Sequence, residues 1–158
     1  MTKVLMERAF RASGHDVVFR VIEGKDRTDA LTPFGLAWVN DMSLADLGRL
    51  SVAKWETIVM GYDAGATRIE DNSGLTCAFC RRFYDEDKAC GGCPIEAYTK
   101  EPSCWSTPYW DYRGELANPD SAPESQRGAA QEELEFVKAV VRWITESNYQ
   151  EPDYEIPF

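Results

Sequence analysis

The chain has 158 residues, of which 44% are hydrophobic and 12% aromatic, and its formal net charge at pH 7 is −10. This length suits about one domain, and the apolar content excludes a disordered chain. The acidity disfavours general nucleic-acid binding, which needs Lys and Arg for phosphate contacts, and it favours binding to a basic protein surface.

The first sixteen residues, MTKVLMERAFRASGHD, are charged throughout and contain no apolar run long enough for a signal peptide. No stretch of the chain approaches the roughly 18 apolar residues of a membrane span. We therefore expect a soluble, cytoplasmic protein without membrane contacts. Thiols stay reduced in that compartment, so paired cysteines indicate metal or redox chemistry before disulfides.

Only short β elements are predicted near the N-terminus. Residues 17–22, VVFRVI, are β-branched and aromatic and are followed by Gly24, which predicts a strand. The polar, proline-interrupted segment 25–35 predicts a loop or a short helical turn. Residues 36–39, LAWV, are either a second strand or a buried turn.

Two patterns predict helix in the middle of the chain. Ser43 has Asp46 three residues later, which resembles a capping box with Asp in place of Glu. The stretch SVAKWETIVMG, which starts at Ser51, has one apolar helical face, and its Gly61 stands where a C-terminal cap belongs. We predict two short helices, or one helix kinked near Gly48 and Ser51.

The C-terminal half is predicted to combine loops with one long helix. Composition predicts a loop over 62–74 and a largely irregular segment over 106–126 that ends near a helix start. In AAQEELEFVKAVVRWITES, 129–147, apolar and charged residues take opposite halves of the helical wheel, which predicts an amphipathic helix of about five turns. This helix is expected to cover the core, although Trp143 on its wide apolar face leaves a partner-binding or dimer role open. The tail, 151–158, is expected to be exposed.

These elements predict one small α+β domain spanning 1–158. It has a short N-terminal β element, middle helices, a four-cysteine region resembling a zinc knuckle or zinc ribbon within 75–110, and a long C-terminal amphipathic helix.

Two Cys-x-x-Cys pairs carry the strongest chemical signal. They are CAFC, with Cys77 and Cys80, and CGGC, with Cys90 and Cys93, and nine residues separate them. Two such knuckles supply the four soft ligands of a tetrahedral zinc site, and their backbone amides can donate to the thiolates. We therefore predict that these four cysteines bind Zn²⁺.

A fifth cysteine leaves the ligand set open. Cys104 can replace any one of the four as an alternate ligand, or it can be a buried thiol. An iron–sulfur cluster is the alternative cofactor, because Cys93-Pro94 matches the end of an iron–sulfur ligand run, although the remaining spacing is absent. A thioredoxin-like redox pair is a third interpretation, but it needs a βαβ context that the sequence does not indicate.

No catalytic constellation is visible in the sequence, so the chain is not predicted to be an enzyme. A catalytic zinc keeps an open position and usually has His, Asp or Glu among its ligands. The only histidine, His15, is far from the cysteines in sequence. The zinc-deaminase pattern, the P-loop, G-x-S-x-G and the Rossmann fingerprint are also absent. The metal is therefore predicted to be structural.

The loop between the knuckles supports an alternative, nucleic-acid-binding interpretation. It mixes basic and aromatic residues, as proteins that bind single strands do. Three consecutive acidic residues, 85–87, cancel the charge locally, so a solvated loop is the preferred interpretation. The candidate nucleic-acid-binding residues are Arg81, Arg82, Phe83, Tyr84 and Lys88.

The order of these features resembles small, cysteine-rich, uncharacterised proteins of bacteriophages and prophages. The shared features are a Lys-Trp helix, two knuckles with Cys-Pro-Ile after the second, a cysteine shortly before Thr-Pro-Tyr, and a Glu-Leu-Glu-Phe helix. They extend from about Ser51 to Val141. The resemblance implies a phage source, a bound metal and a place for Cys104 at the metal site.

The functional prediction combines this resemblance with the charge. Residues 111–158 contain 11 acidic and 4 basic residues, a net charge of −7. We predict a phage-encoded, zinc-stabilised, acidic interaction protein that binds and modulates a host protein in the bacterial cytoplasm, by inhibition and through nucleic-acid mimicry. The alternative is a zinc-ribbon nucleic-acid-binding or transcription-regulatory protein. An enzyme that uses the metal or Cys104 is a third hypothesis.

Overall fold

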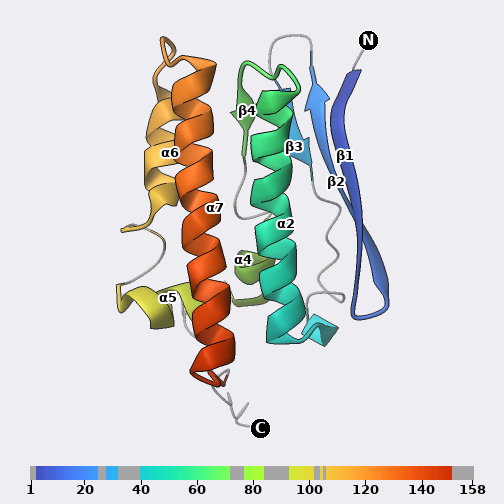
Figure 1. Ribbon diagram of the computed structural model, residues 1–158, viewed down its shortest axis with the longest axis vertical. Helices are drawn as coiled ribbons and strands as arrows, with labels where there is room; N and C mark the ends of the chain where they lie inside the picture. The colour runs from blue at the N-terminus through green and yellow to red at the C-terminus, as the bar shows by residue number, and fades with distance from the viewer. Residues whose placement is uncertain are drawn as a thin grey trace, which may run out of the picture.

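A sheet and a row of long helices lie side by side in the computed structural model, which describes residues 3–24, 28–31, 40–71, 77–83, 93–101, 104 and 106–150 (Figure 1). The strands are β1 (Lys3–Ala12), β2 (His15–Glu23), β3 (Thr28–Leu31) and β4 (Ile69–Glu70). The helices are α2 (Leu44–Asp63), α4 (Ala78–Phe83), α5 (Pro94–Thr99), α6 (Pro108–Ala117) and α7 (Pro123–Glu146). The α+β class and the long C-terminal helix are as predicted.

The strands form one sheet in the order β1-β2-β3-β4. The pairs β1–β2 and β2–β3 are antiparallel, and β3–β4 is parallel. A two-residue turn joins β1 to β2, with Ala12 paired to His15. Its residues, Ser13 and Gly14, have φ angles of 50° and 81°. Positive φ at both positions is typical of the type I′ turn that suits a twisted hairpin.

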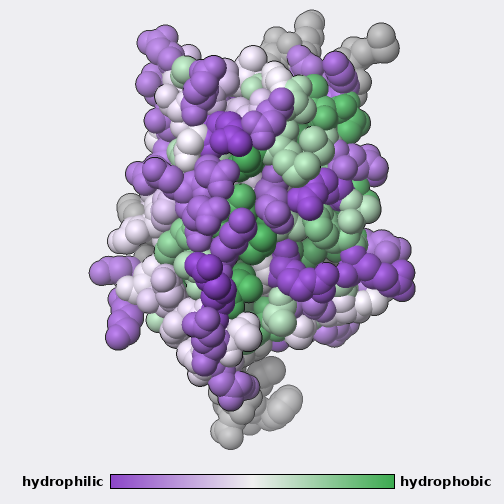
Figure 2. Space-filling view, in the orientation of Figure 1, coloured by the Kyte–Doolittle hydropathy of each residue, from purple (hydrophilic) through white to green (hydrophobic). Residues whose placement is uncertain are grey.

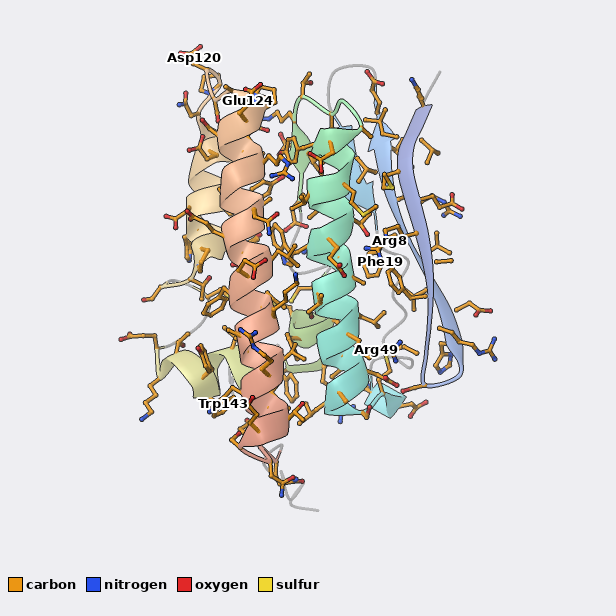
Figure 3. All side chains as sticks on the ribbon, in the orientation of Figure 1. Arg8, Phe19, Arg49, Asp120, Glu124 and Trp143 are labelled. Carbon is orange, nitrogen blue, oxygen red and sulfur yellow. The ribbon has the colours of Figure 1, made fainter. Side chains whose placement is uncertain are left out.

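The buried face of the sheet packs against α2. Val17, Phe19 and Val21 alternate along β2 and are between 0% and 2% exposed. Figure 3 places Phe19, with Arg8 of β1, in the space between the sheet and α2. The arrangement makes α2 the central element, with the sheet on one side and α7 on the other (Figure 1).

The predicted helix start at Ser43 is confirmed. The Ser43 hydroxyl accepts a hydrogen bond from the Asp46 N–H at 3.2 Å and thereby caps α2. The helix then continues without interruption through Gly48 and Ser51, so the predicted division into two short helices is wrong, and the alternative of one helix is confirmed.

Two glycines of α2 lie where the helix backbone closely approaches neighbouring elements. A Cβ at Gly48 would lie 2.9 Å from Cγ2 of Val141 in α7, and one at Gly61 would lie 2.9 Å from Cδ1 of Ile69 in β4. The helix continues past Gly61 to Asp63, so the predicted cap at Gly61 is also wrong. The glycines let α2 approach α7 on one side and the sheet on the other.

The three long helices run alternately up and down. α7 is antiparallel to both α2 and α6, and the short helices α4 and α5 lie near the N-terminal end of α2 and the C-terminal half of α7 (Figure 1). A buried network joins the opposite end of this layer to the sheet. The Tyr62 hydroxyl donates to Gln126 Oε1 at 2.8 Å, lies 2.9 Å from the Tyr112 hydroxyl and accepts from the Ile69 N–H at 3.2 Å.

Several sequence predictions need correction. Residues 17–22 do lie in a strand, but the N-terminal β element is a ten-residue strand and a nine-residue strand in a four-stranded sheet, and β1 was not predicted. Segment 25–35 contains strand β3 and segment 62–74 contains strand β4. Segment 106–126 contains all of α6 and the start of α7. Residues 36–39 and 151–158 lie outside the described residues.

Candidate metal and thiol site

Four cysteines lie at the starts of short helical segments at one end of the helical layer. Cys77 directly precedes α4, and Cys80 lies in its first turn. Cys93 occupies the N-cap position of α5, where Pro94 begins the helix. Cys104 lies in the turn before α6, and its carbonyl accepts a hydrogen bond from the Thr107 hydroxyl at 2.8 Å. Cys90 lies outside the described residues.

The first Cys-x-x-Cys pair forms a knuckle. The Cys80 backbone N–H donates to Cys77 Sγ at 3.5 Å. A hydrogen bond from the Cys80 thiol, together with the positive charge of Lys54, lowers the pKa of Cys77 to about 6, although burial opposes this shift. The same hydrogen bond and the charge of Cys77 raise the pKa of Cys80 well above its ordinary value. At neutral pH the pair therefore carries one negative charge, on Cys77.

The other two cysteines lie within electrostatic reach of this knuckle. Negative charge on Cys104 and Cys93 also raises the pKa of Cys80. Cys93 is buried in the same apolar cluster as Phe79, and Cys77 and Cys104 pack against that cluster. The chain thus brings residues 77, 80, 93 and 104 to one place, although 27 positions separate the first from the last.

The predicted zinc site is only partly visible. Within the residues that the structure describes, no group of three or more His, Cys, Asp or Glu side chains is arranged so that it could hold a metal ion. The donor chemistry nevertheless fits zinc. Several thiols lie together, and a backbone amide already points at one sulfur, as in a metal knuckle. Zn²⁺ therefore stays a prediction, with Cys77, Cys80, Cys90 and Cys93 as the predicted ligands and Cys104 as the alternate for any one of them.

The candidate nucleic-acid-binding residues do not form an exposed platform in the described part of the chain. Phe83 is buried, with 8% exposure, so its ring is not available for stacking on bases. The Arg82 guanidinium lies 5.9 Å from that ring and donates to the Asn40 carbonyl. Tyr84 and Lys88, and the side chain of Arg81, lie outside the described residues.

A small, mostly apolar cavity with a few polar and charged side chains in its lining adjoins the thiols. Its volume of about 30 Å³ has room for about two water molecules. Side chains from α2, α4, α5, α6 and α7 and from the turn before α6 surround it. They are Ser51, Lys54, Trp55, Cys77, Phe79, Cys80, Ile95, Cys104, Tyr109, Glu133 and Val137.

Lys54 supplies the positive charge at this cavity. Its Nζ lies 3.0 Å from Asp71 Oδ1, and the side chains of the two residues are 4% and 0% exposed. The ammonium also lies 5.0 Å from the Trp55 ring. Burial lowers the pKa of Lys54, but the charges of Asp71 and Cys77 outweigh it, so the pKa of Lys54 lies above its usual value. Lys54 is therefore charged at neutral pH, and its contact with Asp71 connects α2 to the residue after β4.

Glu133 contributes a buried carboxyl group from α7. The residue is 3% exposed, and its Oε2 atom has no hydrogen-bond partner among the described residues; the same is true of Ser51 Oγ. Burial raises the pKa of Glu133 to about 8, and the charge of Cys77 adds to this shift. At neutral pH this carboxyl is mostly protonated and can donate a hydrogen bond to a molecule in the cavity.

Lys54, Asp71 and Glu133 were not predicted as site residues from the sequence. Two of them carry a signal. Glu133 falls on the stripe 130, 133, 134 and 137, and Lys54 falls on the stripe 47, 50, 51, 54 and 58. Both stripes have the period of the buried face of a helix, so a charged residue within either of them indicates a buried charge.

Comparison with known proteins does not assign the chain to a family. No protein-family model, no curated protein and no solved structure matches it. The resemblance to phage proteins therefore stays a prediction. Among the described residues, no helix combines the length and apolar character needed to span a bilayer.

Proposed function

We propose that this chain is a zinc-stabilised interaction protein. Cys77, Cys80 and Cys93 bind the ion, together with Cys90 or Cys104. The proposal is supported by one observation above the others: four cysteines, from one knuckle and two other turns, lie close enough for the charges of three to raise the pKa of the fourth, Cys80. Unmetallated thiolates at that separation repel one another, and a divalent cation removes the repulsion.

Zinc at this position has a structural role. Four thiolates complete a tetrahedral shell and leave no position for substrate. The ion connects α4 to α5, and it also connects them to the turn before α6 where Cys104 is the fourth ligand. These short elements have few hydrogen bonds of their own. The binding free energy of the ion then contributes directly to folding of the 75–110 region.

Elemental analysis and thiol titration test the metal proposal. We expect one zinc per chain in protein prepared without added metal, and at most one cysteine that reacts with a thiol reagent before denaturation. Cys93→Ser is expected to lose the zinc. Cys90→Ser and Cys104→Ser form a matched pair, of which only the variant that removes a ligand loses the ion. If elemental analysis finds iron and sulfide, the site holds an iron–sulfur cluster and not zinc. A metal-free protein in which all thiols react would contradict the proposal.

The interaction surface that we propose lies on α6, α7 and the turn between them. In residues 106–150 the most exposed charged residues comprise six acids and two bases. Figure 2 shows hydrophilic side chains along the outward face of α7, and Figure 3 shows Asp120 and Glu124 projecting at the turn. The acids are Asp111, Asp120, Glu124, Glu132, Glu135 and Glu146, and the bases are Arg113 and Arg142. Such a surface is complementary to a basic groove, including one that accepts nucleic acid. We infer that the partner is a basic host protein that the chain modulates by occupying that groove.

Capture from bacterial lysate tests this surface with a charge-matched control. We expect the protein to retain a basic partner at low salt and to release it as ionic strength rises. Asp120→Asn/Glu124→Gln is expected to weaken capture several-fold. Asp41→Asn/Glu101→Gln removes the same charge from exposed residues elsewhere and is expected to have little effect. Equal weakening by both variants, or no capture, would count against the proposed surface.

An enzyme is the second candidate function, and the cavity favours it. Cys77 and the protonated carboxyl of Glu133 line one small space, which places a nucleophile and an acid together. The thiol titration separates the candidates. A closed zinc site protects Cys77, whereas an enzyme that uses it as a nucleophile leaves it reactive in the native protein.

A further inference from the structure

β1 forms one edge of the sheet. It pairs only with β2 among the described strands, and Figure 1 shows it at the outer side of the molecule. At ten residues it is longer than most strands. An edge strand presents a row of backbone donors and acceptors to another chain, and many proteins shield such edges. The only irregularity in β1 is a register shift between Val4 and Met6, so residues 6–12 form a regular edge.

The hairpin turn determines which backbone groups face this edge. In a two-residue turn the flanking residues, Ala12 and His15, exchange hydrogen bonds. Antiparallel pairs then alternate between bonded and non-bonded, and the register is regular from Met6 to Ala12. The N–H and C=O groups of Glu7, Ala9 and Arg11 therefore point away from β2. All three residues are also exposed, with side chains on the outer face of the sheet.

We propose that two copies of this chain pair through their β1 edges, antiparallel, about a two-fold axis at Ala9. Ala9 then lies opposite Ala9 of the second copy, and Glu7 lies opposite Arg11 of the second copy. Each of these pairs exchanges two backbone hydrogen bonds. The two sheets become one continuous sheet across the dimer, and the interface is isologous, as two-fold symmetry requires.

Charge complementarity selects this register. Within one chain Glu7 lies opposite Arg20, with Oε2 and Nε 2.9 Å apart, and Arg11 lies opposite Asp16 at 3.3 Å. Pairing about Ala9 extends these contacts into a row across four strands: Arg20, Glu7, then Arg11 and Asp16 of the second copy. The charges alternate along the row, and the two-fold axis generates a second such row. Small Ala9 side chains meet between the rows.

Neighbouring symmetric registers either place like charges together or lose the opposite-charge pairs. A two-fold axis at Phe10 puts Ala9 opposite Arg11 of the second copy, so it makes no opposite-charge pair. A two-fold axis at Glu7 puts two Glu7 carboxylates opposite each other, and axes at Arg8 or Arg11 do the same with two guanidinium groups. The axis at Ala9 instead puts Arg8 opposite Phe10 of the second copy on the inner face. Within one chain the Arg8 guanidinium already lies 4.8 Å from the centre of the Phe10 ring, which is a cation–π contact. The dimer therefore places a second cation–π pair of the same kind across the interface.

Two single charge reversals test the dimer. Sedimentation velocity of the wild-type chain at about 100 µM is expected to give a dimer. Arg11→Glu places Glu opposite Glu in both rows, and Glu7→Arg places Arg opposite Arg, so each variant is expected to weaken the dimer about tenfold or more. Mixing the two variants restores opposite charges in both rows, and a heterodimer is expected to form. A monomeric wild-type chain, or variants that stay dimeric, would overturn the proposal.

Proline at position 9 tests the backbone pairing separately. The Ala9 N–H is not used within the hairpin, so Ala9→Pro removes only hydrogen bonds to the second copy. We expect a folded monomer, with circular dichroism like that of the wild-type chain. Ala9→Ser keeps the N–H and is expected to stay dimeric. Dimers formed by a folded Ala9→Pro chain would show that the interface lies elsewhere, and the charge reversals decide the question if this variant does not fold.

Discussion

Replacing Lys54 with methionine is expected to lower the free energy of unfolding by about 3–5 kcal/mol, because the change removes one partner of a buried ion pair. The Lys54 and Asp71 side chains are 4% and 0% exposed, and their charged atoms lie 3.0 Å apart. Methionine fills a similar volume, so the loss arises mainly from the Asp71 carboxylate that stays buried without the ammonium. Urea denaturation at pH 7, with equal metal content in both proteins, measures the difference.

An exposed ion pair in the same layer provides the control. Arg127 Nε lies 2.7 Å from Asp63 Oδ1, but these side chains are 40% and 55% exposed. Water screens such a pair, so Arg127→Met is expected to cost much less stability than Lys54→Met. Replacing both partners of the buried pair, as in Lys54→Met/Asp71→Leu, is expected to recover part of the stability that Lys54→Met loses. Similar losses from Lys54→Met and Arg127→Met would contradict the argument.

Local sequence signals predicted the elements whose stability arises within one helix or one strand. The Ser43 cap and the apolar stripe of α7 depend on residues a few positions apart, and both predictions are confirmed. β1 carries Glu7, Arg8 and Arg11, and only its pairing with β2 makes this charged segment a strand. β3 and β4 are four and two residues long and depend on contacts with distant segments.

α6 illustrates how tertiary contacts override composition. Its residues, PYWDYRGELA, contain a proline and a glycine and have no clear apolar stripe, so the sequence favoured an irregular segment. Pro108 instead occupies the first turn, where a missing N–H has no cost. The Tyr112 side chain is fully buried, and its hydroxyl donates to the Ile69 carbonyl. These contacts with the sheet keep the segment helical.

The candidate site also contains one part that local sequence predicts and one part that only the fold reveals. The cysteines were identified from spacing, because a knuckle is a local structure. The charged residues beside them come from α2, α7 and the end of β4, and no local pattern predicts that these elements meet. Lys54 and Glu133 could be flagged as charges on apolar stripes, but Asp71 follows a two-residue strand and carries no such signal. Only the fold shows that it is the partner of Lys54.

Replacing Glu133 with glutamine is expected to remove the contribution of one buried carboxyl to the pH dependence of stability in the neutral range. Burial raises the pKa of Glu133 from 4.5 to about 8. The folded chain therefore holds a proton that the unfolded chain releases between these two values. The stability that this group contributes is fully present below pH 4.5 and is lost as pH rises through about 8, a difference on the order of 5 kcal/mol.

The test compares Glu133→Gln with Glu135→Gln, which changes an exposed residue two positions along the same helix. Unfolding free energies are measured at pH 5, 6, 7, 8 and 9 with constant metal content. Cys77 titrates in all three proteins, so the difference between the wild-type chain and each variant isolates the substituted carboxyl. The stability of the wild-type chain relative to Glu133→Gln is expected to fall as pH rises, whereas its stability relative to Glu135→Gln is expected to stay constant. Glu133→Gln becomes the more stable protein at pH 8 and above, because a neutral amide has no charge to bury. An equal slope in all three proteins would mean that Glu133 ionises in the folded chain at its ordinary pKa. Water or a cation would then have to stabilise the carboxylate within the cavity, which would favour the enzyme over the closed zinc site.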